Sequence, residues 1–215
     1  MRAGFPQFQF YFKYARCIAR AMTQDFVKDI DGYLERLKKV YDILDRDQIN
    51  AAMNAILEAY EAKKTIFIFG NGGSSATASH YVCDFNKGVS ICLEKKFRLI
   101  CLNDNVPSVM AIANDCGFEK IFKMQLESLM NDGDYVIAIS GSGNSKNVLE
   151  GVEYAKSRGG KIITLTGYSG GKLLPMADYP IHANVDNMQL AEDVHMMICH
   201  LISSTIAIHF GHPMC

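Results

Sequence analysis

Short apolar runs rich in β-branched and aromatic residues alternate with amphipathic helical patterns from residue 65 to residue 209, and this alternation constrains the fold most strongly. The runs are TIFIFG (65–70), FRLICL (97–102), YVIAIS (135–140), KIITLTG (161–167) and DYPIHA (178–183). They are too continuously apolar for one face to lie in water, which is typical of a parallel sheet that helices cover on both sides. The sequence therefore predicts a three-layer α/β fold with a five-stranded parallel sheet.

Amphipathic patterns predict the helices of this fold. Two of them precede the first strand, from Phe26 to Leu44 and from Ile49 to Tyr60, with apolar residues three or four positions apart. Further helices are expected at about 75–86, 106–115, 118–130, 145–158 and 188–209. Ligands of open α/β sheets bind beyond the carboxyl ends of the strands, so a site is expected in the loops that follow the strands.

Composition and charge exclude several classes of protein. A chain of 215 residues with 49% hydrophobic and 21% charged residues is typical of one globular domain. The formal net charge of −1 and the lack of a Lys/Arg stripe on the expected helices argue against a nucleic-acid partner. No apolar run reaches the roughly 20 residues of a membrane helix. The seven cysteines contain no C-x-x-C pair, so neither a disulfide framework nor a zinc knuckle is indicated, and a cytoplasmic location suits them.

The first residues of the chain differ from the rest. Residues 1–21 are aromatic and basic and contain no acidic residue, but Lys13, Arg16 and Arg20 interrupt the apolar core that a signal peptide would need. We interpret residues 1–21 as an N-terminal extension and residues 22–215 as a single domain. Met22 is then a candidate for the natural start, and an amphipathic arm or targeting segment is the alternative.

The loop after the first strand has the composition of an anion-binding turn. The segment GNGGSS (70–75) runs from the strand straight into a helix, so its backbone can turn tightly and present N–H groups at the positive end of the helix. The alternative is a plain turn in which Ser74 or Ser75 caps the helix.

The loop after the third strand strengthens the first interpretation. The segment SGSGNS (140–145) again leads into a helix and brings three hydroxyl groups to one turn. Neither loop matches the Walker A or the dinucleotide-binding pattern, so a monophosphate is the favoured ligand over a nucleotide. A third polar segment follows the fourth strand at 164–172 and is a weaker signal.

Ionisable residues on two expected helices suggest acid–base or metal chemistry. His80 and Asp84 are four residues apart and share a helix face, whereas Glu192 and His200 lie on the last helix in an apolar segment. Alternatively, His80 pairs with Asp84 on a solvated face and Glu192 pairs with His195 at the surface. Together the residues suit zinc or a similar divalent ion, which would polarise a sugar carbonyl and stabilise an enediolate. Because about 12 Å of helical rise separates Glu192 from His200, both reach one metal only if the helix is distorted, if it begins near Glu192, or if subunits share the site.

These segments resemble the phosphoheptose isomerase branch of the SIS sugar-isomerase domains. The likeness extends from about residue 24 to residue 210 and rests on GNGGSSATASH (70–80), ISGSGNSKNV (139–148), TLTG with GGK (164–172) and VHMMICHLI (194–202). The resemblance implies a flavodoxin-like fold with a five-stranded parallel sheet, two N-terminal helices used in tetramer packing, and active sites built between subunits.

The resemblance also implies roles for individual residues. Asp84 would be catalytic base and metal ligand, His200 general acid and metal ligand, and His80 and Glu192 further metal ligands. The substrate and phosphate would be held at Asn71, Gly72, Gly73, Ser74, Asp104, Ser140, Gly141, Ser142, Ser145 and Glu192. Two of these positions depart from the family pattern, because Asp84 stands where the family has a glutamate and Glu192 where it has a glutamine.

The expected function is aldose–ketose isomerisation of a sugar phosphate by a cytoplasmic homo-oligomer, with a tetramer as the expected form. The leading substrate hypothesis is sedoheptulose 7-phosphate, converted to glycero-manno-heptose 7-phosphate for nucleotide-heptose and surface-glycan synthesis. One alternative is an isomerase of another ketose phosphate. Another is a non-catalytic SIS module, either a sugar-phosphate sensor or a relative of replication-initiation regulators. Ionisable residues at all four catalytic and metal positions favour an enzyme.

Overall fold

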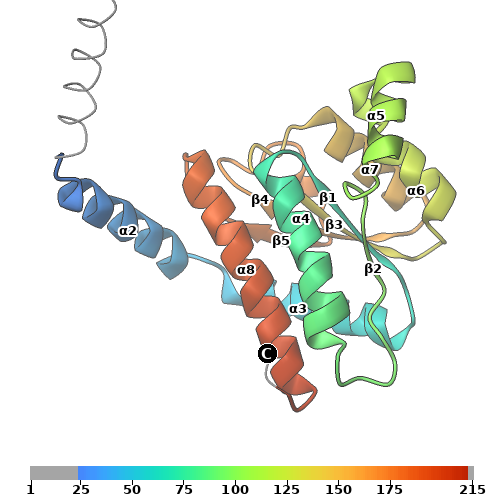
Figure 1. The fold of residues 1–215 in the computed structure, drawn as a ribbon, viewed down its shortest axis with the longest axis horizontal. Coiled ribbons are helices and arrows are strands. Elements are labelled where there is room, and N and C mark those ends of the chain that lie inside the picture. Colours follow the sequence, from blue (N-terminus) through green and yellow to red (C-terminus); the bar gives the residue numbers. More distant parts are fainter. Residues whose placement is uncertain (1–23, 213–215) are drawn as a thin grey trace, which may run out of the picture. The chain divides into compact units, whose positions relative to one another are not determined.

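The computed structural model describes residues 24–212, shown as a ribbon in Figure 1. The predicted extension at residues 1–21 lies outside the described residues. The chain divides into a short N-terminal unit that ends at Lys38 and a larger unit that begins at Lys39. Helix α2 (Val27–Asp42) makes up most of the described part of the first unit and continues for four residues into the second, which contains the sheet and the remaining helices.

The five-stranded parallel sheet predicted from the sequence is confirmed. Its strands lie in the order β2–β1–β3–β4–β5, and every neighbouring pair is parallel. Their bounds are β1 Ile66–Gly70, β2 Leu99–Cys101, β3 Tyr135–Ser140, β4 Lys161–Thr166 and β5 Tyr179–His182. Strands β1 and β3 are buried along their whole length, which explains their continuous apolar sequences. Strand β2 is shorter than the predicted run because it lies at the edge and has one neighbour.

The helices also follow the predicted pattern, with two local differences. They are α3 Arg46–Glu61, α4 Gly73–Cys83, α5 Val106–Asp115, α6 Lys123–Leu129, α7 Lys146–Ser157 and α8 Met188–His209, with short helical turns η2 Phe118–Lys120 and η3 Leu174–Met176. Helix α4 continues as a π-helix, η1, over Asp84–Val89. The single helix expected at 118–130 is broken between η2 and α6. The adjacent Ile121 and Phe122 at the break are both buried, whereas neighbouring residues of an α-helix point about 100° apart.

Helices cover both faces of the sheet, so the three-layer expectation is confirmed. Side chains alternate between the faces of a strand, and Phe67 and Phe69 of β1 pack in one core with Phe122, Val148 and other residues of the α6 and α7 region. On the opposite face, α4 contacts β1 and α8 contacts β4. Helices α4 and α8 run side by side, as Figure 1 shows.

Asparagine and aspartate side chains define where several helices begin. Asp45 accepts hydrogen bonds from the amides of Asp47 and Gln48 at the start of α3, and Asn187 accepts one from Leu190 at the start of α8. These caps satisfy amides that have no partner within the helix. In the described residues, no helix is long and apolar enough to cross a membrane.

Candidate active site

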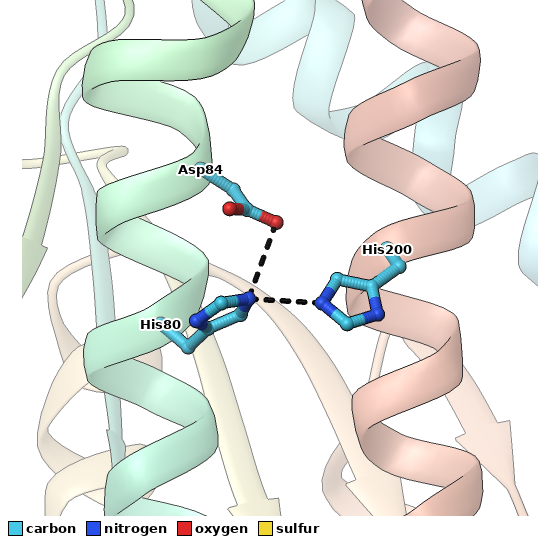
Figure 2. A group of neighbouring side chains, drawn as sticks. All are labelled: His80, Asp84 and His200. Atoms are coloured by element: carbon cyan, nitrogen blue, oxygen red, sulfur yellow. Dashed lines mark hydrogen bonds and ion pairs between the residues drawn. The ribbon is translucent and has the colours of Figure 1, made fainter. Parts of the chain in front are cut away.

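Two histidines and an aspartate from neighbouring helices meet at one point between α4 and α8 (Figure 2). The Nε2 atoms of His80 and His200 are 2.9 Å apart, and Nε2 of His80 lies 3.6 Å from Oδ2 of Asp84. One potential ligand atom from each residue lies within 4.8 Å of the other two. The structure therefore brings together His80, Asp84 and His200, which are candidate acid–base and metal-binding groups.

Asp84 is the most enclosed member of this cluster. Its side chain is 14% exposed, against 42% for that of His80, and its Oδ2 atom accepts a hydrogen bond of 3.3 Å from the Ser203 hydroxyl. Asp84 is the first residue of the π-helix η1, a geometry that is often found at functional sites. Burial, and to a lesser extent the Asp84 carboxylate, raises the pKa of the Cys199 thiol, which therefore stays protonated beside the cluster.

The fourth expected metal ligand, Glu192, does not join this cluster within one chain. A Cβ atom placed on Gly73 would overlap the Glu192 carboxylate, so this carboxylate lies at the N-terminus of α4. Helix α8 is a continuous α-helix from Met188 to His209, and about 12 Å of rise separates Glu192 from His200. This continuous helix excludes a distorted helix and a helix that begins near Glu192, which leaves a site shared by subunits.

The loop after β1 leaves the start of α4 without a side-chain cap. The N-cap residue is Gly72, with φ 55°, and no side chain accepts a hydrogen bond from the first turn. The serine-cap alternative is therefore wrong: the Ser75 hydroxyl donates to the Gly72 carbonyl, and Ser74 is buried. Amides at an uncapped helix N-terminus favour a negatively charged ligand or side chain.

The loop after β3 brings two of its three hydroxyl groups together, while the Ser142 hydroxyl accepts from the amide of Asn144. The Oγ atoms of Ser140 and Ser145 are 3.3 Å apart, and Ser140 Oγ accepts a hydrogen bond of 3.2 Å from the amide of Gly143. Ser145 is the N-cap of α7 but makes no capping hydrogen bond. Its hydroxyl therefore lies at the start of α7 with the Ser140 hydroxyl as its hydrogen-bond partner.

Asp104 lies away from the histidine–aspartate cluster. It follows β2, is exposed, and its amide donates to the Cys101 carbonyl over 3.4 Å. The structure places this acid in the loop after β2, as the sequence predicts, without bringing it to His80, Asp84 or His200.

Sequence reasoning placed His195 incorrectly and missed three asparagines. His195 is 1% exposed, and burial lowers its pKa to about 4. The alternative of a surface pair with Glu192 is therefore wrong. Asn103, Asn144 and Asn147 make hydrogen bonds between segments that follow neighbouring strands, and no role was predicted for these amides from the sequence.

Comparison with known proteins decides the family. A family model for the SIS domain matches residues 25–167. The chain is 35% identical over 193 residues to a phosphoheptose isomerase from Helicobacter pylori, covering 89% of this chain and 99% of that protein. It is 36% identical over 178 residues to a probable phosphoheptose isomerase from Thermoplasma acidophilum, covering 83% and 97% respectively. The chain belongs to the phosphoheptose isomerase family.

A solved structure of the phosphoheptose isomerase family has the same fold. The enzyme from Francisella tularensis superposes with a TM-score of 0.79 at 28% identity, covering 86% of this chain and 100% of that chain. The family and fold that the sequence motifs indicate are therefore confirmed. His80, Asp84 and the serine loop lie within the matched SIS domain, whereas His200 lies beyond it on α8.

Proposed function

We propose that this chain is an aldose–ketose isomerase that interconverts sedoheptulose 7-phosphate and glycero-manno-heptose 7-phosphate, within nucleotide-heptose synthesis for surface glycans. Its membership of the phosphoheptose isomerase family supports the reaction and the substrate. The single observation that carries the proposal is the convergence of a carboxylate and two imidazoles at one point, on helices beside two polar loops.

Asp84 is the proposed base of this reaction. It takes the proton from the hydroxyl-bearing carbon next to the carbonyl and delivers it to the carbonyl carbon itself. The carbonyl and hydroxyl groups thereby exchange places. The Ser203 hydroxyl donates to Asp84 Oδ2 and holds this oxygen in place.

His200 is the proposed general acid. During the reaction the hydroxyl oxygen of the sugar loses a proton and the carbonyl oxygen gains one. An imidazole can accept the first proton and donate the second near neutral pH. Its Nε2 atom faces His80 in the cluster, and its side chain is exposed enough to reach a bound sugar. His200 and Asp84 then act on adjacent atoms of the same substrate.

The same residues fit a divalent metal. Two imidazoles and a carboxylate with ligand atoms within 4.8 Å of one another are a donor set that zinc takes in catalytic sites, where a further position stays open for substrate. When bound, zinc would polarise the carbonyl and stabilise negative charge on the sugar oxygens. His80, Asp84 and His200 would hold it, and Glu192 would take part as a ligand only if subunits share the site.

The serine loop is the proposed phosphate site. Ser140, Ser142 and Ser145 would donate from their hydroxyls and Gly141 from its backbone amide, as charge-assisted hydrogen bonds to the phosphate. The rest of the sugar would contact the backbone of Asn71, Gly72 and Gly73, with Ser74, Asp104 and Glu192 as the remaining contacts expected from the family pattern. The carboxylate of Glu192 at the start of α4 is well placed to accept from sugar hydroxyls.

We also propose that the protein works as a homo-oligomer, in the tetrameric form, in the cytoplasm. Phe26, Ile30 and Leu34 on or next to α2 are each more than half exposed and follow one another at four-residue spacing. An apolar stripe of this kind is suited to packing against a second copy. The described cysteines are all free, which fits a reducing compartment. Light scattering tests the first proposal: a mass above the 23.9 kDa monomer supports it, and a clean active monomer contradicts it.

The experiment that tests the function is a panel assay. The purified chain is incubated with sedoheptulose 7-phosphate and with shorter ketose phosphates, with and without added zinc, and aldose formation is followed by chromatography. We expect turnover, with the seven-carbon substrate preferred. If only a different ketose phosphate were turned over, that sugar would be the substrate instead of sedoheptulose 7-phosphate. Tight binding without any turnover would favour the sugar-phosphate sensor.

A further inference from the structure

The loops that follow β2 and β1 are joined by the side chain of Asn103. Its Oδ1 atom accepts a hydrogen bond of 3.2 Å from the amide of Gly70, and its Nδ2 group donates one of 2.9 Å to the carbonyl of the same glycine. The side-chain amide of Asn103 therefore binds both the N–H and the carbonyl of Gly70, the last residue of β1.

A second amide contact joins the loop after β1 to the start of α7. Asn71 Nδ2 donates to Asn147 Oδ1 over 2.9 Å, and Asn147 Nδ2 donates back to Asn71 Oδ1 over 2.8 Å. Asn147 is 2% exposed, and its Oδ1 atom also accepts from the amide of Val148. Both polar atoms of Asn71 are thus engaged with Asn147.

A third contact, made by Asn144, joins the loop after β3 to the loop after β4. Asn144 Nδ2 donates to the Ser142 carbonyl over 2.9 Å, and Asn144 Oδ1 accepts from the amide of Lys172 over 3.2 Å. The backbone reinforces this link, because the amide of Leu173 donates to the Gly143 carbonyl over 3.0 Å.

We propose that Asn71, Asn103, Asn144 and Asn147, which we call the asparagine belt, are positioning residues that fix the spacing between the loops of the site. The three contacts follow the order of the strands, from β2 to β1, from β1 to β3 and from β3 to β4. This inference rests on the proposed function, because that function assigns the phosphate to the serine loop and the reacting carbons to residues on α4 and α8. Asn71 then acts through Asn147 and offers the substrate its backbone rather than its side chain.

The chemistry of the amide group suits this task. An amide can donate and accept at once, so two asparagines can pair reciprocally, whereas a carboxylate only accepts when ionised. An amide also carries no charge, so the belt does not repel a phosphate and keeps its hydrogen bonds over the pH range in which Asp84 and His200 exchange protons. Small errors in placement are costly, since a shift of about 1 Å can lower a rate by about 100-fold.

The test uses the pair Asn71 and Asn147. Asn147→Leu and Asn71→Leu each remove one half of the reciprocal contact without adding charge, and the double variant removes both. Asn54→Leu is the matched control, because Asn54 is exposed on α3 and bonds only to the Asn50 carbonyl one turn away. Steady-state kinetics with sedoheptulose 7-phosphate and calorimetry with inorganic phosphate are measured for all five proteins.

For each single variant we expect kcat to fall about 10- to 100-fold, while the dissociation constant of inorganic phosphate changes less than twofold. The double variant should be no slower than the slower single variant, because the two residues act as one contact. A kcat within twofold of the parent in both single variants would overturn the proposal. So would a loss of phosphate affinity as large as the loss of kcat, because the asparagines would then be phosphate ligands.

Hydrogen exchange separates this proposal from the proposed function and from a failure of either variant to fold. Backbone amides of residues 71–75 and 141–145 should exchange faster in Asn71→Leu and Asn147→Leu than in the parent, with unchanged exchange in β3 and β4. If the parent had no isomerase activity, the proposed function would fail. The hydrogen-exchange result would still show whether the asparagine belt holds the loops in place. Unchanged exchange in both loops, or faster exchange throughout the sheet, would contradict the belt.

Discussion

The Nε2 atoms of His80 and His200 lie 2.9 Å apart although the residues are 120 positions apart in the chain. At this distance one ring donates to the other, or both direct lone pairs at a shared ion. Asp84 completes the group one helical turn from His80. The packing of α4 against α8 thus creates a small volume in which two imidazoles and a carboxylate can act on the same ligand.

Replacing His200 by glutamine should remove the proposed general acid while keeping a side chain of similar polarity. We expect kcat to fall by about 100- to 10,000-fold, with little change in KM. His209→Gln is the matched control, because His209 is exposed near the end of the same helix. Parental turnover in His200→Gln would remove His200 from the mechanism.

Serine substitutions should separate phosphate binding from chemistry. Ser142→Ala and Ser145→Ala each remove a proposed charge-assisted hydrogen bond, which is worth about 1.5–3 kcal/mol, so KM should rise about 10- to 100-fold with a small effect on kcat. Ser157→Ala is the control, because its hydroxyl donates to the Tyr154 carbonyl at the end of α7. If both loop variants bound substrate as tightly as the parent, the phosphate would lie elsewhere.

Metal binding should depend on His80 and on pH. The His80→Ala variant should bind zinc at least 10-fold more weakly than the parent, measured by equilibrium dialysis and elemental analysis. Zinc content of the parent should also fall on acidification, because protons compete with the metal for the imidazoles and the carboxylate. A fully active protein without metal, insensitive to chelators, would leave Asp84 and His200 as a metal-free acid–base pair.

His195 should make stability depend on pH. Burial lowers its pKa to about 4 in the folded protein, from an ordinary value of 6.5, and the nearby His182 also has a pKa lowered by burial. His195 therefore binds a proton more readily in the unfolded chain than in the folded protein. Burial of neutral His195 contributes fully to the free energy of unfolding above pH 6.5, and this contribution is lost as the pH falls from 6.5 towards 4.

The size of this effect is at most about 3 kcal/mol for His195. Urea unfolding of the parent and of His195→Leu between pH 7 and pH 4 measures it. The free energy of unfolding should fall less steeply with acid in the variant. Parallel pH profiles would show that His195 does not titrate on unfolding.

The layers and strands of this fold could be predicted because a strand that is buried on both faces has a continuously apolar sequence. The runs from Ile66 to Gly70 and from Tyr135 to Ser140 are apolar throughout, and both are fully buried strands. The π-helix from Asp84 to Val89 was missed, because one extra residue in a turn leaves no periodic signal in six residues.

The site could be predicted only in part. The spacing of His80 and Asp84 places them on one helix face, but the proximity of His200 depends on how α4 packs against α8, which periodicity does not encode. The same holds for Asn71 and Asn147, whose reciprocal contact joins residues 76 positions apart. Glu192 was grouped with the cluster because it is a potential metal ligand on the same helix as His200, whereas the continuous helix α8 keeps it near Gly73.

The most direct test of the central claim is deuterium incorporation during turnover in heavy water. If Asp84 moves the proton between adjacent carbons, the parent should incorporate deuterium from solvent at the carbon next to the carbonyl of sedoheptulose 7-phosphate, detected by mass spectrometry. Asp84→Asn should lose this exchange by about 100-fold or more while binding inorganic phosphate as the parent does. Parental rates of exchange in Asp84→Asn would contradict the account.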